Sequence, residues 1–174
     1  MENETHIIEH SFERKLNLGA GIRPINGYEN HDILELPGIQ HVFDLEETPY
    51  PLADNSYDEI FSHHCAEHIG NFVPMIFECH RMLKPGGKLI IEVPYVRSMG
   101  AIANPFHVGY FDEMTMDIFY SQESCWNIKC DKPLFKLDKI SMEFGTLAPL
   151  QWLLWKSKIF WCGGCIRYEL TALK

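Results

Sequence analysis

The sequence predicts an α/β fold: one domain built on a doubly wound, mostly parallel sheet. Three observations lead to this prediction. Short apolar or alternating runs, bounded by Gly, Pro or Asn, recur seven times along the 174 residues. A pattern of helical period separates the fourth run from the fifth, and a Gly-x-Gly turn follows the first run. Strands that alternate with helices favour a parallel sheet with right-handed crossovers.

The first strand is expected at residues 15–19, and it ends in the turn Gly19-Ala20-Gly21. Two glycines one residue apart allow a tight turn and a close approach of a ligand to the backbone. Ligands of doubly wound sheets lie beyond the carboxyl ends of the strands, so this turn is the first candidate binding element. A dinucleotide fingerprint does not fit, because Pro24 stands where Gly-x-Gly-x-x-Gly needs its third glycine.

The other elements follow in chain order. The helical spacing of Phe72, Met75 and Ile76 predicts a helix over residues 72–83, and Pro85 with the two glycines after it ends that helix. A second helix is expected at about 113–120. The remaining strands are expected at residues 28–34, 41–45, 57–64, 88–94, 135–144 and 166–173.

The links between the first four strands are unusually short. Residues 20–27 and 35–40 are too few for a crossover helix, and residues 46–56 contain Pro49 and Pro51. Half of the sheet should therefore lack its covering helices and expose apolar surface. The Trp-rich segment 147–161 is the expected cover, either by folding back or by meeting a second subunit in a homodimer.

Composition limits the domain organisation and the partners. The chain is interpreted as a single domain, 1–174, with an N-terminal extension at 1–14 and a C-terminal acceptor or interface region at 123–174 that holds the last two strands. The formal net charge of −9 argues against a nucleic-acid binder. No run resembles a signal peptide or a membrane span, so a cytoplasmic protein with reduced cysteines is expected. Segment 147–161 has no clean cationic face, so membrane contact is not expected.

Further motifs follow the glycine turn at characteristic distances. Asp32 comes with the second strand and Asp44 with the third, and residues 44–60 lead into the fourth. Glu67-His68-Ile69 and residues 81–89 complete the set. Over roughly residues 15–122 the chain resembles the class I S-adenosylmethionine-dependent methyltransferases, in a small, abbreviated Rossmann-like form. This resemblance implies a seven-stranded sheet whose last strand is antiparallel.

The resemblance also implies S-adenosyl-L-methionine as the cofactor. Gly19 and Gly21 would pass under its methionine part, and Asp32 would accept hydrogen bonds from the ribose hydroxyls. Asp44 would read the adenine amino group while Leu45 packs on the base. The expected cofactor-binding residues are Asn17, Gly19, Ala20, Gly21, Arg23, Asp32, Asp44, Leu45, Ser62 and His63.

Two features of the chain depart from the family pattern. Asn17 stands where many members have an acidic residue. The helix that usually follows the first strand is absent, and its N-terminus would favour the carboxylate of the cofactor. Arg23 would supply the missing positive charge.

The expected activity is transfer of a methyl group to a hydroxyl or another small polar group of a small-molecule or glycan-like acceptor. A hydroxyl acceptor needs a base, for which His107 is the first candidate and His64 the second, because imidazoles titrate near neutral pH. The alternative from another class is a non-catalytic S-adenosylmethionine- or nucleotide-binding protein with a regulatory or assembly role.

Two patterns resemble metal sites, but no metal site is assigned. Residues 64–68 have the form His-x-x-Glu-His of some zinc proteases, yet they follow a strand directly and lack the helix that this motif requires. A cysteine set could hold zinc and would make the chain a zinc-stabilised interaction module. The simpler interpretation is that these cysteines are buried thiols. The set comprises Cys125, Cys130, Cys162 and Cys165.

Overall fold

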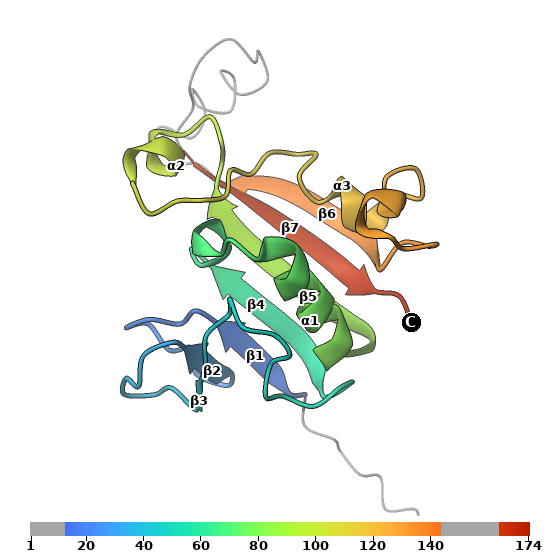
Figure 1. The fold of residues 1–174 in the computed structure, drawn as a ribbon. Helices are drawn as coiled ribbons and strands as arrows, with labels where there is room; N and C mark the ends of the chain where they lie inside the picture. Colours follow the sequence, from blue (N-terminus) through green and yellow to red (C-terminus); the bar gives the residue numbers. More distant parts are fainter. Residues whose placement is uncertain (1–12, 144–163) are drawn as a thin grey trace, which may run out of the picture.

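The computed structural model describes residues 13–143 and 164–174, and the predicted fold class is confirmed (Figure 1). Seven strands form one sheet in the order β3-β2-β1-β4-β5-β7-β6. Neighbouring strands are parallel, except that β7 runs antiparallel to β5 and to β6, as the resemblance implied for the last strand. The strands are β1 (Lys15–Leu18), β2 (Glu29–Asp32), β3 (His41–Val42), β4 (Tyr57–His63), β5 (Leu83–Pro94), β6 (Phe135–Glu143) and β7 (Cys165–Ala172).

Two strands differ clearly from their predicted bounds. β3 has only 2 residues. β5 begins earlier than predicted, at Leu83, directly after helix α1 (Phe72–Met82). Tyr57 of β4 pairs with Leu83 and Glu59 pairs with Lys88, so residues 84–87 form an irregularity within β5 rather than a turn before it.

Helix α1 lies over one face of the sheet, in front of β4 and β5 in Figure 1. At its start, Phe72 packs edge to face against Phe119 of α3 (Asp117–Tyr120), with ring centroids 6.1 Å apart, so α3 covers the same face. None of the described helices is long and apolar enough to cross a membrane. The apolar side chains that α1 buries at helical spacing are Met75, Ile76, Cys79 and Met82.

The second predicted helix is shorter than expected. Of residues 113–120 only Asp117–Tyr120 is helical, and residues 113–116 form turns. Asp112 accounts for the difference, because its Oδ1 accepts a hydrogen bond from the Met114 amide at 2.9 Å. Such side chain–backbone bonds compete with helix formation. Three short helices complete the fold: η1 (Ala66–His68), α2 (Met99–Ala103) and η2 (Cys125–Ile128).

The opposite face of the sheet has no described helix, and the links between the first four strands contain none either, as predicted. The strand register places polar side chains in rows on this face, such as His63, Glu92 and Arg167. Arg167 lies 3.4 Å from Glu92 and over the ring of Phe61, 5.8 Å from its centroid. These polar rows lie on β4, β5 and β7, whereas Ile22, Ile33, Leu34 and Val42 around the first three strands are exposed, so the apolar surface expected over that half of the sheet stays a prediction. Segment 147–161 lies outside the described residues, and the homodimer stays a prediction.

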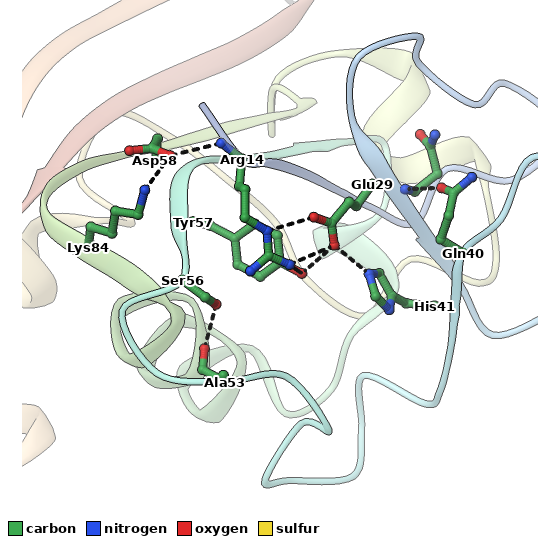
Figure 2. Close-up of polar contacts among 10 residues, drawn as sticks. Arg14, Glu29, Gln40, His41, Ala53, Ser56, Tyr57, Asp58 and Lys84 are labelled. Atoms are coloured by element: carbon green, nitrogen blue, oxygen red, sulfur yellow. Dashed lines mark hydrogen bonds and ion pairs between the residues drawn. The ribbon is translucent and has the colours of Figure 1, made fainter. Parts of the chain in front are cut away.

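A cluster of polar and charged side chains around Glu29 links the amino ends of the first four strands (Figure 2). Arg14 Nε donates to Glu29 Oε1 at 2.8 Å. The Tyr57 hydroxyl and His41 Nε2 lie 2.9 and 2.8 Å from Glu29 Oε2. Because crossover helices are absent here, this cluster supplies cross-links between strands at the edge opposite to the glycine turn.

Candidate functional site

The glycine turn lies at the carboxyl end of β1, where both glycines adopt left-handed backbone angles, with φ of 71° at Gly19 and 54° at Gly21. Their surroundings differ. A Cβ atom on Gly19 would collide with the side chain of Cys65, whereas one on Gly21 would meet no atom within 4 Å. Gly19 is thus required by packing within the protein, and Gly21 leaves space through which a ligand can approach the backbone.

Two clefts meet at this turn, with volumes of about 340 and 520 Å³, within the usual size of small-molecule sites. Gly19, Gly21 and His64 line both of them. The smaller cleft holds the predicted Asp32, Asp44 and Leu45, and also His31, Ile33, Cys65, His68 and Ile69. The larger cleft holds the predicted Asn17, Ala20, Arg23 and His63, and also Ile22, Ile25 and Phe61.

The smaller cleft brings together the carboxylate that ends β2 and the one that follows β3. Asp32 Oδ2 accepts a hydrogen bond from the Gly21 amide at 2.8 Å, which anchors the glycine turn. Asp44 Oδ1 accepts one from the Glu46 amide at 2.9 Å. Each carboxylate oxygen offers two lone pairs, so both side chains keep acceptor capacity for the hydroxyl or amino groups of a ligand.

In the larger cleft, Asn17 is a structural residue as well as a lining one. Its Nδ2 donates to Asn30 Oδ1 at 2.9 Å, and the same oxygen accepts the Ile25 amide at 2.8 Å. The two amides therefore hold the loop that replaces the missing crossover helix. Arg23 is exposed and forms no ion pair within residues 13–143 and 164–174, so its guanidinium is available to an anionic ligand.

His64 connects the clefts to β7 and to a buried carboxylate. Its Nε2 lies 3.4 Å from Cys165 Sγ, and its Nδ1 lies 3.2 Å from Glu67 Oε1. These hydrogen bonds, first that with Cys165 and then that with Glu67, raise the pKa of His64 to about 10. His63 behaves differently, because burial and the neighbouring His64 lower its pKa. At neutral pH the imidazole of His64, at the junction of the clefts, is therefore the positively charged form with a proton on both nitrogens.

Two predicted site residues line neither cleft. Ser62 is fully buried. Its place in the register beside Leu18 and Ile91 puts it on the face that α1 covers. The side chain of His107 is only 5% exposed, and its Nε2 lies 3.9 Å from Glu67 Oε1 behind the smaller cleft.

The four cysteines of the possible zinc set do not come together in the described residues. Cys125 and Cys130 precede β6, whose first residue pairs with the last of β7. Cys165 begins β7 at the other edge of the sheet. The thiols of Cys125 and Cys130 donate to backbone carbonyls, and Cys162 lies outside the described residues.

Sequence reasoning missed four residues that shape the site: Asn30, Cys65, Glu67 and His68. Asn30 and Cys65 carry no local signal, because their partners Asn17 and Gly19 are distant in sequence. Glu67 and His68 did carry one, in the His-x-x-Glu-His spacing. The zinc-protease interpretation of that spacing requires a longer helix, whereas the structure places residues 66–68 in a single 3₁₀ turn.

The sheet order, the antiparallel β7, the glycine turn after β1, the carboxylate at the end of β2 and the one after β3 are typical of one class of protein. These are the features of the class I S-adenosylmethionine-dependent methyltransferases, which the chain resembles in fold. Residues 29–91 match the family model described as a methyltransferase domain. The resemblance found in the sequence is thus confirmed, and S-adenosylmethionine is the cofactor of this class.

The individual proteins that this chain resembles are either low in sequence identity or matched over a small part of their length. Phosphoethanolamine N-methyltransferase 2 of Caenorhabditis elegans is 35% identical over 57 residues, which make up 33% of this chain and only 13% of that protein. A methyltransferase from Archaeoglobus fulgidus has a similar structure, with a TM-score of 0.62, 16% identity, and coverage of 92% of this chain and 86% of that one. Phosphoethanolamine N-methyltransferase 2 of Haemonchus contortus, solved with S-adenosyl-L-methionine, has a TM-score of 0.56 and 18% identity over 93% of this chain and 49% of that one. Structural likeness at such low identity shows the fold alone.

Proposed function

We propose that the protein transfers the methyl group of S-adenosylmethionine to a hydroxyl or another small polar group of a small-molecule or glycan-like acceptor. The observation that carries the proposal is the junction of the two clefts at Gly19 and Gly21. Asp32 and Asp44 lie on one side of that junction, and Arg23 lies on the other. This is the distribution of charge that a ligand with a diol and an amine at one end and a carboxylate at the other requires.

The described residues fit the parts of this cofactor. Asp32 has free acceptor capacity for the ribose diol, and Asp44 has it for the adenine amino group. Leu45 offers apolar surface to the base beside them. Arg23 supports binding of the carboxylate, for which a guanidinium is the best donor set. Bound there, the cofactor supplies a methyl group on a positively charged sulfur.

Transfer needs alignment more than covalent catalysis. A lone pair of the acceptor forms a bond to the methyl carbon while the carbon–sulfur bond breaks, and its electron pair stays on sulfur. A hydroxyl acceptor must also lose its proton. The two imidazoles proposed as bases differ in position: His64 faces the clefts but carries a proton, and His107 lies behind Glu67. Protonated His64 is better suited to hold an electron-rich acceptor than to take its proton.

Calorimetric titration with S-adenosylhomocysteine and S-adenosylmethionine tests the first half of the proposal. Absence of binding by the folded protein would overturn it. The second half is tested by label transfer from methyl-labelled cofactor to panels of hydroxyl compounds, sugars and phosphoethanolamine, the last chosen because the curated relative is named for it. Binding without transfer to any panel would favour the regulatory or assembly role.

A further inference from the structure

We propose that Glu67, His68 and His107 form a site for one divalent metal ion beside the smaller cleft. The carboxylate and the two imidazoles each present a ligand atom, and these atoms all lie within 4.8 Å of one another. Glu67 and His68 come from the 3₁₀ turn η1, and His107 comes from the loop after α2, 39 positions further along the chain. The amides of Val108 and Gly109 hold that loop in place by donating to the Glu67 carbonyl at 2.9 and 3.0 Å.

The carboxylate of Glu67 points to a ligand because its second oxygen is unsatisfied. Glu67 is only 1% exposed, and its Oε2 is buried without a hydrogen-bond partner within the described residues. Its other oxygen lies near His64, at 3.2 Å. His107 does not satisfy the carboxylate, because 3.9 Å is too long for a hydrogen bond. A buried carboxylate oxygen without a partner is costly, so such a group in a folded protein calls for a bound ion or another donor.

Both imidazoles are held in the form that binds metals. His107 Nδ1 lies 2.8 Å from the Ala101 carbonyl, and His68 Nδ1 lies 3.1 Å from the Phe106 carbonyl. A carbonyl oxygen only accepts, so each Nδ1 carries a hydrogen and each Nε2 is the nitrogen left to a metal ion. A backbone carbonyl on the far nitrogen is the usual support of a metal-binding histidine. The rings meet edge to face at 74°, with centroids 4.7 Å apart.

Two imidazoles and one carboxylate suit Zn²⁺, Mn²⁺, Fe²⁺ or Co²⁺ better than Mg²⁺ or Ca²⁺, which prefer oxygen ligands throughout. Three protein ligands leave coordination positions open, as in catalytic metal sites. His68 also lines the smaller cleft, so an open position there is reachable from the cleft.

The role of the ion rests on the proposed function, although its binding does not. An acceptor oxygen in the open position would have its pKa lowered by the metal, and its proton would pass to solvent water. The acceptors favoured by this arrangement carry two neighbouring oxygens, such as a diol or a hydroxy acid, because these can chelate the ion. His107 would then be a metal ligand rather than the base.

The test starts from the full chain freed of metal by a chelator and titrated with Zn²⁺, Mn²⁺ and Co²⁺ by calorimetry. We expect one equivalent to bind, and Co²⁺ to give a visible absorption band of mixed nitrogen and oxygen coordination. Glu67→Gln, His68→Asn and His107→Asn should each weaken binding about 100-fold or more. His68 is exposed, so its variant keeps the fold even if the other two do not. The matched control is His41→Asn, which removes an imidazole beside a carboxylate at the opposite edge of the sheet.

Wild-type protein that binds none of these ions, or ligand variants that bind Co²⁺ as tightly as the His41 control, would overturn the site. Titration with S-adenosylhomocysteine keeps this outcome separate from the proposed function. If cofactor binds but metal does not, the metal site is wrong and the proposed function stands. If metal binds but cofactor does not, the proposed function fails alone.

Discussion

The side chain of Cys65 occupies the space in which a side chain on Gly19 would begin. A Cβ atom built on Gly19 would lie 2.5 Å from the Cβ of Cys65, and it would also clash with the Sγ of Cys65. Burial raises the pKa of this thiol to about 12, so Cys65 stays neutral and packs as a small apolar group. The glycine at the end of β1 is therefore needed by the packing of the loop after β4, before any cofactor is considered.

Gly19→Ala should destabilise the protein by about 2–4 kcal/mol, because the left-handed backbone and the contact with Cys65 both penalise a Cβ atom. Gly21→Ala should cost only about 1–2 kcal/mol, from the backbone alone. Its methyl group lies in open space at the cleft junction, so it should weaken S-adenosylhomocysteine binding instead. Urea denaturation and calorimetry on both variants check this contrast. Equal loss of stability in the two would contradict the packing role of Cys65.

Asp32→Ala should weaken S-adenosylhomocysteine binding by about 1.5–3 kcal/mol, the range for hydrogen bonds to a charged group. The variant loses the proposed acceptor of the ribose diol and the anchor of the Gly21 amide. Asp58→Ala serves as control, since Asp58 bonds Lys84 at 2.7 Å at the opposite edge of the sheet. Calorimetric affinity should change in the first variant only; an unchanged affinity in folded Asp32→Ala removes Asp32 from the site.

Asn30→Ala should lower both stability and cofactor affinity. Asn30 is 4% exposed, and its side chain bonds Asn17, the Ile25 backbone and the Tyr28 carbonyl. Loss of a buried group with several partners costs about 2–4 kcal/mol. Because these bonds hold the loop between β1 and β2, the larger cleft should loosen as well. Retention of full cofactor affinity by the variant would show that the loop conformation does not depend on this amide.

Glu29 should make stability depend on pH in the acidic range. Burial alone would raise its pKa, but hydrogen bonds from Arg14, His41 and Tyr57 outweigh burial and lower the pKa from 4.5 to about 2. The stabilisation is therefore complete above the unfolded pKa and is lost as the pH falls from about 4.5 towards 2. Glu29→Gln should cost about 1–3 kcal/mol at pH 7 and much less near pH 2. Urea midpoints of the wild type and of Glu29→Gln, measured between about pH 2 and pH 7, test this prediction. A difference in stability that does not change with pH would count against the cluster around Glu29 shown in Figure 2.

The elements proposed to bind the cofactor were predictable from the sequence by itself. A strand that ends in Gly19-Ala20-Gly21, and acidic residues at the ends of the next two strands, are patterns of a few neighbouring residues. In a parallel sheet the carboxyl ends of neighbouring strands share one edge, so Asp32 and Asp44 had to lie near the glycine turn. The missing crossover helices followed from link length alone.

Tertiary structure decided which side chains meet. It brought His107 next to Glu67 and His68. It also placed Ser62 on the buried face of the sheet that α1 covers, and it separated Cys125 and Cys130 from Cys165. No local pattern determines such encounters, because they depend on loop paths and strand register that a one-residue change would alter. The sequence therefore determined where the two clefts and the proposed cofactor site lie in this fold, whereas the side chains that meet beside them depend on contacts that only the folded chain creates.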